Sequence, residues 1–204
     1  MLILGAGYDA RAYRLEALAE ARVFEVDNPN TQVQKRERLR KISKADVGLV
    51  IYVSLDFDRD SLRDALARAS FDPQSRTLFL WEGVTNYLTE DGVNATLEFV
   101  GSVADGSKLI FTYVDSEVLR DPQQFDGGER LQRMFRRIEE RWTFGLDPTQ
   151  TSKLLSSHGL LLIDDIDSVT YRAKYMGKSG PHLRGYEFYR VAVADVNNSI
   201  RNAR

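Results

Sequence analysis

The feature that most constrains the fold is a glycine-rich turn at the start of the chain. An apolar run over residues 1–4 leads directly into Gly5-Ala6-Gly7, and a helical pattern begins at Ala10. This order predicts a strand, a tight turn and a helix, in which Gly5 permits the turn and Gly7 exposes bare backbone to a ligand. N–H groups at the helix start are then expected to face that ligand. The turn predicts a nucleotide-cofactor site that includes Gly5, Ala6 and Gly7, with a purely structural turn as the alternative.

Composition is typical of a globular α/β protein. The chain has 204 residues, enough for one such domain, and 43% of them are hydrophobic and 28% charged. A net charge of −2 gives no reason to expect nucleic acid or a membrane surface as a partner, and no apolar run approaches the ~20 residues of a membrane span. There is no cysteine, and two isolated histidines do not make a metal site. We therefore expect a cytoplasmic protein without a resident metal.

Apolar runs and helical patterns alternate along the chain. Strands are expected at residues 1–4, 22–27, 49–53, 76–81, 108–114, 160–163 and 186–194. Helices are expected at residues 10–20, 31–43, 60–69, 89–104 and 147–158. This alternation is typical of a parallel sheet, and the last two strands, with no clear helix between them, fit an antiparallel pair at one edge. The pattern predicts a doubly wound, Rossmann-like α/β sheet in a single domain, 1–204, with a helical insertion at about 115–146.

Three acids follow the second, third and fourth expected strands: Asp27, Asp56 and Glu82. Because the carboxyl ends of parallel strands meet at one edge of the sheet, all three are expected beside the glycine turn. Asp27 lies 20 residues after Gly7, the spacing of an acid that binds both ribose hydroxyls. An NAD-dependent oxidoreductase would share this feature, so that class is an alternative.

Two of these acids do not belong to the dinucleotide pattern. The carboxylate of Asp56 can accept from the exocyclic amine of an adenine, while Phe57 offers a backbone N–H and an apolar face to the base. Glu82 is suited to a cationic group. S-adenosylmethionine has a ribose diol, an adenine amine and a cationic amino-acid end, without a pyrophosphate. The sequence therefore predicts this cofactor, and for each acid a helix cap or surface group is the alternative.

Several motifs together resemble the leucine carboxyl methyltransferase-like family, in its bacterial S-adenosylmethionine-dependent branch. They are LGAGYDARAYRL at 4–15, FEVDNP at 24–29, LDF at 55–57, WEGVTNYLT at 81–89 and FGLDP at 144–148. The resemblance implies a seven-stranded methyltransferase sheet with cofactor contacts at Gly5, Asp27, Asp56, Phe57 and Glu82. It also implies a helical lid before the first motif. Nothing in this sequence matches that segment, so we expect the lid to be absent and the cofactor's methionine end to be open to water.

Few residues have catalytic chemistry near the expected crevice. Tyr87 and Tyr113 are candidates to bind substrate or a hydroxyl proton, and His182 lies on a loop that could reach a substrate; a structural place is the alternative for each. Methyl transfer needs donor and acceptor in line and water excluded, and a carboxylate acceptor needs no base. The sequence predicts O-methylation of a carboxylate or acidic hydroxyl on a small molecule or peptide. A non-catalytic cofactor-binding remnant is the second alternative.

Overall fold

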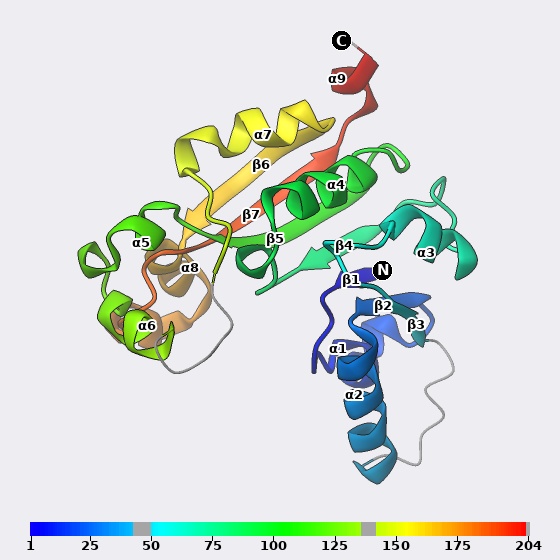
Figure 1. Ribbon diagram of the computed structural model, residues 1–204, viewed down its shortest axis with the longest axis horizontal. Helices are drawn as coiled ribbons and strands as arrows, with labels where there is room; N and C mark the ends of the chain where they lie inside the picture. Colours follow the sequence, from blue (N-terminus) through cyan, green and yellow to red (C-terminus); the bar gives the residue numbers. More distant parts are fainter. Residues whose placement is uncertain (43–49, 136–141, 203–204) are drawn as a thin grey trace.

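The computed structural model describes residues 1–42, 50–135 and 142–202 (Figure 1). Within these residues, seven strands form one sheet in the order β3-β2-β1-β4-β5-β7-β6. The strands are β1 (Leu2–Leu4), β2 (Val23–Asp27), β3 (Val50–Ser54), β4 (Leu78–Trp81), β5 (Lys108–Val114), β6 (Leu160–Asp167) and β7 (Tyr189–Val196). Strand β7 runs antiparallel to β5 and β6, and the pairs among β1 to β5 are parallel. The predicted doubly wound α/β fold is confirmed, with the antiparallel strand one place inside the β6 edge.

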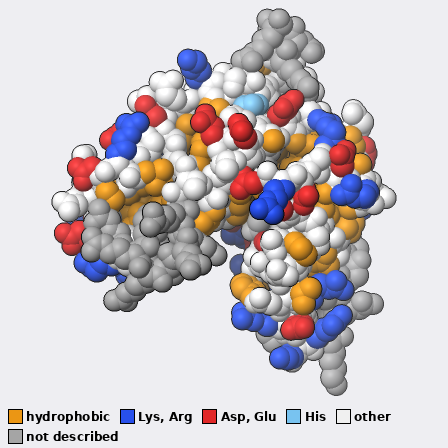
Figure 2. Space-filling view, viewed as in Figure 1, with side chains coloured by type: hydrophobic (Ala, Val, Ile, Leu, Met, Phe, Trp, Pro, Cys, Tyr) orange, Lys and Arg blue, Asp and Glu red, His pale blue; other side chains and the backbone are white. Residues whose placement is uncertain are grey.

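Helices lie on both faces of this sheet. They are α1 (Arg11–Arg14), α2 (Pro29–Ile42), α3 (Leu62–Arg68), α4 (Glu90–Val100), α5 (Glu117–Arg120), α6 (Gly128–Phe135), α7 (Thr151–Ser157), α8 (Ser168–Tyr175) and α9 (Asn198–Asn202). In Figure 1, α4 and α7 lie in front of β5, β6 and β7, while α1 and α2 extend from the other end of the sheet. Figure 2 shows acidic and basic side chains interspersed over the face that carries α4 and α7, without a continuous basic surface.

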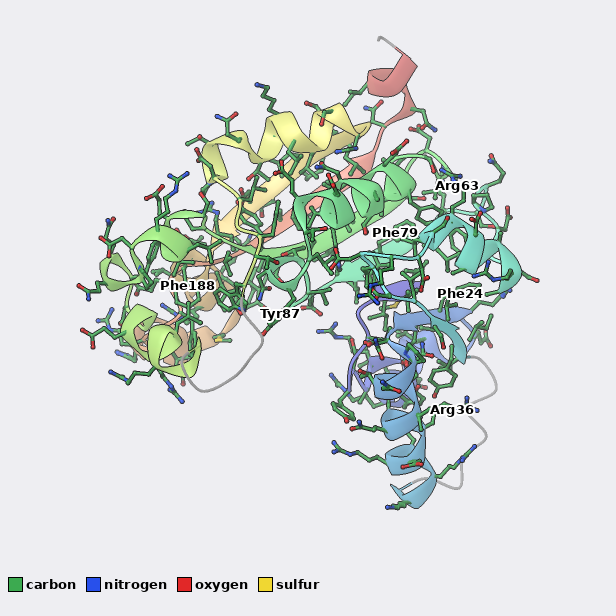
Figure 3. All side chains as sticks on the ribbon, viewed as in Figure 1. Phe24, Arg36, Arg63, Phe79, Tyr87 and Phe188 are labelled. Carbon is green, nitrogen blue, oxygen red and sulfur yellow. The ribbon has the colours of Figure 1, made fainter. Side chains whose placement is uncertain are left out.

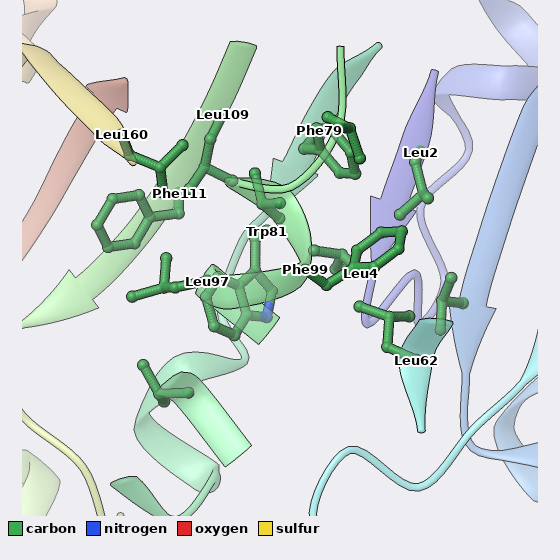
Figure 4. Close-up of a cluster of buried hydrophobic side chains, with 14 of the residues drawn as sticks. Leu2, Leu4, Leu62, Phe79, Trp81, Leu97, Phe99, Leu109, Phe111 and Leu160 are labelled. Atoms are coloured by element: carbon green, nitrogen blue, oxygen red, sulfur yellow. The ribbon is translucent and has the colours of Figure 1, made fainter. Parts of the chain in front are cut away.

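The short first strand is buried on both faces. Leu2 and Leu4 are fully buried in the main core with Leu97 of α4, and Figure 4 shows Leu97 beside Trp81 in this cluster. Ile3 points to the opposite face, where it packs with a smaller cluster that includes Ala6. A parallel strand covered on both faces needs an unbroken apolar run. The glycine turn therefore follows the most buried strand and is fixed in position by it.

Three elements of the structure differ from the expectation. The helix expected over 10–20 is only the one-turn α1, because Leu15 takes an extended conformation before a short 3₁₀ turn, Glu16–Leu18. Conversely, α8 lies in a stretch where no helix was expected, and its start is capped by Asp167, which accepts a hydrogen bond from the N–H of Thr170. Strand β6 also continues beyond the expected 163, because an edge strand pairs on one side and tolerates polar residues.

The segment after β5 is helical where the structure describes it. It contains α5, a 3₁₀ turn at Pro122–Gln124, and α6. The helical insertion expected at about 115–146 thus contains α5 and α6, and residues 136–141 lie outside the described part. Val118 of α5 and Leu131 of α6 are buried in a cluster with Phe188, separate from the main core. No helix in the described ranges is long and apolar enough to cross a membrane.

Candidate functional site

Backbone N–H groups of the glycine turn are already bonded within the chain. Those of Gly5 and Ala6 both donate to the carbonyl oxygen of Val26, at 2.8 and 3.0 Å. The N–H of Gly7 donates to Oδ2 of Asp27 at 2.5 Å. These bonds wrap the turn over the end of β2. The N–H groups of these three residues therefore have their partners within the chain.

The start of α1 is also satisfied by the chain itself. The N–H of Arg11 donates to Oδ1 of Asp9 at 2.7 Å. Ala10, where the helical pattern begins, is exposed, and the buried small residue of the turn is Ala6. A one-turn helix whose first N–H is occupied by a carboxylate is a poor site for an anion, because that carboxylate repels negative charge.

Glycine is needed at three positions of the site for different structural reasons. Gly5 has φ +66°, and a Cβ there would collide with the side chain of Val84. Gly7 (φ +42°) and Gly83 (φ +69°) also have positive φ, but a Cβ at Gly83 would meet no atom within 4 Å, and one at Gly7 would meet the carbonyl oxygen of Gly5 at 4.0 Å. Gly5 therefore permits contact between two loops, whereas Gly7 and Gly83 leave bare backbone beside open space.

A cavity of about 230 Å³ lies at the carboxyl ends of β1 to β4. It is lined by Gly5, Asp27, Asn28, Leu55, Asp56, Phe57, Gly83, Val84 and Tyr87. Five of these were named from the sequence: Gly5, Asp27, Asp56, Phe57 and Tyr87. The other four are Asn28, Leu55, Gly83 and Val84. Each lies next to a named residue or within a named motif, so their positions at the strand ends were the sequence signal that could have identified them. The structure thus brings the carboxylates of Asp27 and Asp56 and the ring of Phe57 to one cavity.

The loop that carries Asp56 is held by its own hydrogen bonds. The N–H of Asp58 donates to Oδ1 of Asp56 at 3.1 Å, and the N–H of Asp56 donates to Asp60 at 2.8 Å. Asp58 in turn accepts from both the N–H and the hydroxyl of Thr89, at 3.0 and 2.7 Å. Thr89 is the N-cap of α4, so the loop is fixed to that helix. The Asp56 side chain is 41% exposed, and its Oδ2 lies 3.8 Å from Nε of Arg59.

Glu82 is paired with a cation of the chain itself. The guanidinium of Arg11 forms an ion pair with Glu82, and the same Nη1 lies 3.0 Å from Oδ2 of Asp9. The hydrogen bond to Glu82 raises the pKa of Arg11 above its usual value. Glu82 is not among the residues that line the cavity, although its neighbour Gly83 is. The predicted acid therefore adjoins a residue that lines the cavity, and it has a positive partner within the chain.

Of the candidate catalytic residues, Tyr87 lies at the cavity. Its side chain is 41% exposed, and its ring stands edge-on to that of Trp142, with centroids 6.5 Å apart. In Figure 3, Tyr87 lies between the end of the molecule that carries α2 and the end that carries α5 and α6. His182 is exposed in a separate 3₁₀ turn, Gly177–His182, and does not line the cavity. The geometry brings Tyr87, and not His182, to the predicted crevice.

Tyr113 is enclosed in the core. Its hydroxyl donates to Oδ2 of Asp165 at 2.6 Å and accepts from Nε of Arg190 at 3.0 Å. Burial, together with the hydrogen bond to Asp165, raises the pKa of Tyr113 well above its usual value. The side chain is fully buried and does not line the cavity. Its hydroxyl therefore remains protonated and serves a buried polar network that joins β5, β6 and β7.

A second cavity of about 550 Å³ lies between α4, α5 and α7. It shares no lining residue with the first, and none of the residues predicted for the site lines it. Among the described residues, no group of three His, Asp or Glu could hold a metal ion. The cavity beside the glycine turn is therefore the candidate functional site.

The fold of the chain agrees with that of solved methyltransferases of Rossmann-like architecture. A structure from Listeria monocytogenes, titled "putative S-adenosylmethionine dependent methyltransferase", matches with a TM-score of 0.64 at 13% identity, over 96% of this chain and 90% of that one. Magnesium protoporphyrin IX methyltransferase from Synechocystis PCC 6803, solved with S-adenosylhomocysteine, matches with a TM-score of 0.55 at 13% identity, over 95% and 72% of the chains.

Sequence comparison identifies the family. The leucine carboxyl methyltransferase family matches residues 1–101. Two relatives carry the name "Putative S-adenosyl-L-methionine-dependent methyltransferase": one from Mycolicibacterium paratuberculosis is 34% identical over 142 residues, and YktD of Bacillus subtilis is 26% identical over 188 residues. These alignments cover 69% and 91% of this chain but 44% and 62% of the relatives, so the chain spans about half the length of the curated relatives it matches. The chain belongs to the leucine carboxyl methyltransferase-like family.

Proposed function

We propose that the chain is the cofactor-binding part of an S-adenosylmethionine-dependent methyltransferase. The observation that carries this proposal is the convergence of Asp27, Asp56 and Phe57 on one cavity beside the glycine turn. These groups match a ribose diol, an adenine amine and an adenine face. The names of the family relatives and the bound ligand of the Synechocystis structure favour the same cofactor.

The donor set fits this cofactor better than a dinucleotide. A pyrophosphate needs N–H donors or cations, as the helix N-terminus of dinucleotide-binding folds provides. Here the N–H groups of Gly5, Ala6 and Gly7 already have partners, and the described residues that line the cavity include no Lys or Arg. S-adenosylmethionine has no phosphate, so occupied N–H groups do not count against it. This contrast disfavours the NAD-dependent alternative.

Each residue has a role in this proposal. Asp27 would hold the ribose hydroxyls, while Asp56 and the backbone and ring of Phe57 would hold the adenine. Gly7 and Gly83 would let the ligand approach the backbone without a side chain in between. The cofactor supplies an electrophilic methyl group on a sulfonium. The chain's contribution is to hold donor and acceptor in line and to limit access of water.

The finer part of the proposal is that the acceptor is an oxygen of a carboxylate or acidic hydroxyl. Tyr87 is the one candidate catalytic side chain that lines the cavity, and burial holds the hydroxyl of Tyr113 protonated in a separate network. A carboxylate is already nucleophilic near neutral pH and needs no general base. Tyr87 would form part of the wall for the acceptor, which approaches between the α2 end and the α5–α6 end of the molecule (Figure 3). The acceptor would be a small molecule or the end of a peptide.

Calorimetry with S-adenosylhomocysteine and with NAD tests the proposal. We expect the purified protein to bind S-adenosylhomocysteine, and to bind NAD more weakly or not at all. Stronger binding of NAD than of S-adenosylhomocysteine would contradict the proposal and would favour the alternative of an NAD-dependent oxidoreductase. Methyl transfer to a panel of carboxylates and phenols, followed with a labelled methyl donor, then tests the acceptor class.

A further inference from the structure

We propose that the second cavity, between α4, α5 and α7, is a binding site for a small amphipathic carboxylate. Its volume is about 550 Å³, against about 230 Å³ for the cavity beside the glycine turn. This volume lies within the range of about 300–1,000 Å³ that is usual for sites of small organic ligands. The inference goes beyond the proposed function and does not depend on it, because the cofactor and the acceptor are assigned to the other cavity.

One wall of this cavity is a face of α7. Thr151 and Leu155 of that helix are fully buried against the sheet. The residues that line the cavity lie on another face of α7 and its cap, at intervals of three and four residues: Gln150, Lys153, Leu154 and Ser157. Glu90 and Asn94, four residues apart on α4, provide a second wall. In Figure 1, α4 and α7 lie on the same face of the sheet.

The segment 143–146 forms a third wall and is fixed at both ends. The N–H of Thr143 donates to the carbonyl oxygen of Asn86 at 2.8 Å. The N–H of Leu146 donates to the carbonyl oxygen of Val114, at the end of β5, at 2.9 Å. The cavity is therefore preformed, as sites for small ligands usually are.

Apolar side chains give the cavity a surface for the body of a ligand. They are Leu119, Phe144, Leu146 and Leu154. Leu146 belongs to the main core and is 8% exposed, whereas Leu119 of α5 is 37% exposed. An apolar group bound here would remove the Leu119 side chain from water, which is favourable in proportion to the apolar area covered.

The charged lining residues favour an anionic end on that ligand. Two are basic, Arg120 of α5 and Lys153 of α7, and one is acidic, Glu90 of α4. Nη1 of Arg120 already lies 2.6 Å from Oε1 of Glu117, whereas the described residues offer the ammonium group of Lys153 no acidic partner. We therefore expect a carboxylate beside Lys153 on the α7 wall, and not beside Glu90 on α4, with the apolar body against Leu154.

The competing explanation is that the cavity is only a gap between helices and that Lys153 is a solvated surface charge. Such a gap could take up apolar molecules weakly, but it would not distinguish a carboxylate from a neutral amide of the same shape. The proposed site would distinguish them, and the preference would depend on Lys153. The ligands 4-phenylbutanoate and 4-phenylbutanamide differ in this group alone, so the ratio of their affinities separates the explanations.

The experiment is an NMR titration of the isotope-labelled protein with each of these probes, on the wild type, Lys153→Gln and Lys178→Gln. Lys178 is the matched control, because it is an exposed lysine in the turn Gly177–His182 and does not line the cavity. We expect backbone amide shifts in α7 and in the segment 143–146. The wild type should bind 4-phenylbutanoate about fivefold or more tightly than the amide, since a charge-assisted bond is gained.

The variants test where this preference comes from. Lys153→Gln should weaken 4-phenylbutanoate by about the same factor and change the affinity for the amide less than twofold, so that the ratio falls towards one. Lys178→Gln should change neither affinity. Lys153→Arg keeps the positive charge and should retain most of the preference. Saturating S-adenosylhomocysteine should leave the affinity for 4-phenylbutanoate unchanged, because the two cavities share no lining residue.

Equal affinities for the two probes, or equal losses in both lysine-to-glutamine variants, would overturn the inference in favour of a simple gap. Absence of binding would overturn it as well. Competition with S-adenosylhomocysteine, or shifts confined to the cavity beside the glycine turn, would place the probe in the wrong site and would also contradict it. A wild type that binds 4-phenylbutanoate at α7 but not S-adenosylhomocysteine would support this inference while contradicting the proposed function.

Discussion

The backbone N–H of Gly7 donates a hydrogen bond to Oδ2 of Asp27 at 2.5 Å, and this bond joins the turn after β1 to the end of β2. The second oxygen of Asp27 accepts from the N–H of Asn28 at 2.6 Å. An ionised carboxylate has about four acceptor positions on its two oxygens, so two remain after these bonds. Asp27 can therefore shape the turn and bind a ligand with the same side chain.

Substitution of Asp27 should weaken cofactor binding strongly. Asp27→Asn preserves the size of the side chain but loses the negative charge, and bonds to a charged group are each worth about 1.5–3 kcal/mol. We expect the affinity for S-adenosylhomocysteine to fall by at least about tenfold, as measured by calorimetry. Asp91→Asn, an exposed acid in the first turn of α4, is the control and should have no effect. An Asp27→Asn protein with wild-type affinity would leave Asp27 as a structural residue alone.

Asp56 should determine the preference for adenine. If its carboxylate accepts from the exocyclic amine, the wild type will discriminate against the inosine analogue of S-adenosylhomocysteine, which has an oxygen at that position. Asp56→Ala should bind the two ligands with more similar affinities, because the discriminating acceptor is gone. Competition binding with both ligands measures this ratio. A mutant that prefers adenine as strongly as the wild type would remove Asp56 from the base site.

The buried ion pair between Glu25 and Lys35 should be costly to break on one side. Nζ of Lys35 lies 2.7 Å from Oε2 of Glu25, and the two side chains are 4% and 1% exposed. Burial raises the pKa of Glu25 despite the nearby cation. Lys35→Met leaves the acid buried without its partner, which should lower the free energy of unfolding by about 3–5 kcal/mol in a urea titration.

Two further variants control this prediction. The double variant Glu25→Met, Lys35→Met removes both charges and should recover most of the lost stability. Lys41→Met, at an exposed position of the same helix α2, should change stability little. A double variant as unstable as Lys35→Met would show that the loss comes from packing and not from the unpaired charge.

Acid should weaken the cap of α8. The N–H of Thr170 donates to Oδ1 of Asp167 at 2.7 Å, and this bond lowers the pKa of Asp167. Because the folded pKa is below the unfolded value of about 3.9, the stabilisation is present above that pH and is lost as the pH falls through the folded pKa. NMR titration of the Asp167 carboxyl carbon should give a midpoint below the ordinary value. On acidification below about pH 4, the Tm of Asp167→Asn should decrease less than the Tm of the wild type. An equal decrease in Tm in both proteins would contradict this account.

The positions of the strands in the chain were predictable because buried parallel strands need unbroken apolar runs. Each such run also ends where a polar residue meets the crevice, so Asp27 and Asp56 were identifiable from their positions alone. The short α1 was not predictable, since the extended conformation of Leu15 is not encoded in hydrophobic periodicity. Helix α8 was missed for a related reason: its apolar positions are few, and its start depends on a single cap at Asp167.

The partners of the site residues could not be read from the sequence. The N–H of Gly7 faces Asp27 instead of a ligand, because the turn folds back over the end of β2. Glu82 was placed correctly after β4, but its ion pair with Arg11 joins residues 71 positions apart in the chain. Likewise, the burial of Tyr113 against Asp165 depends on how β7 enters the sheet. Such long-range contacts depend on the tertiary arrangement and not on local pattern.

The central claim is that the cavity beside the glycine turn holds the adenosine part of S-adenosylmethionine. The most direct measurement is a crystal structure of the protein grown with S-adenosylhomocysteine. We predict density for the ligand in this cavity, with the ribose hydroxyls within hydrogen-bonding distance of Asp27 and the adenine between Asp56 and Phe57. A well-resolved structure in which the cavity stays empty at saturating ligand, or in which the adenosine contacts other residues, would contradict the account.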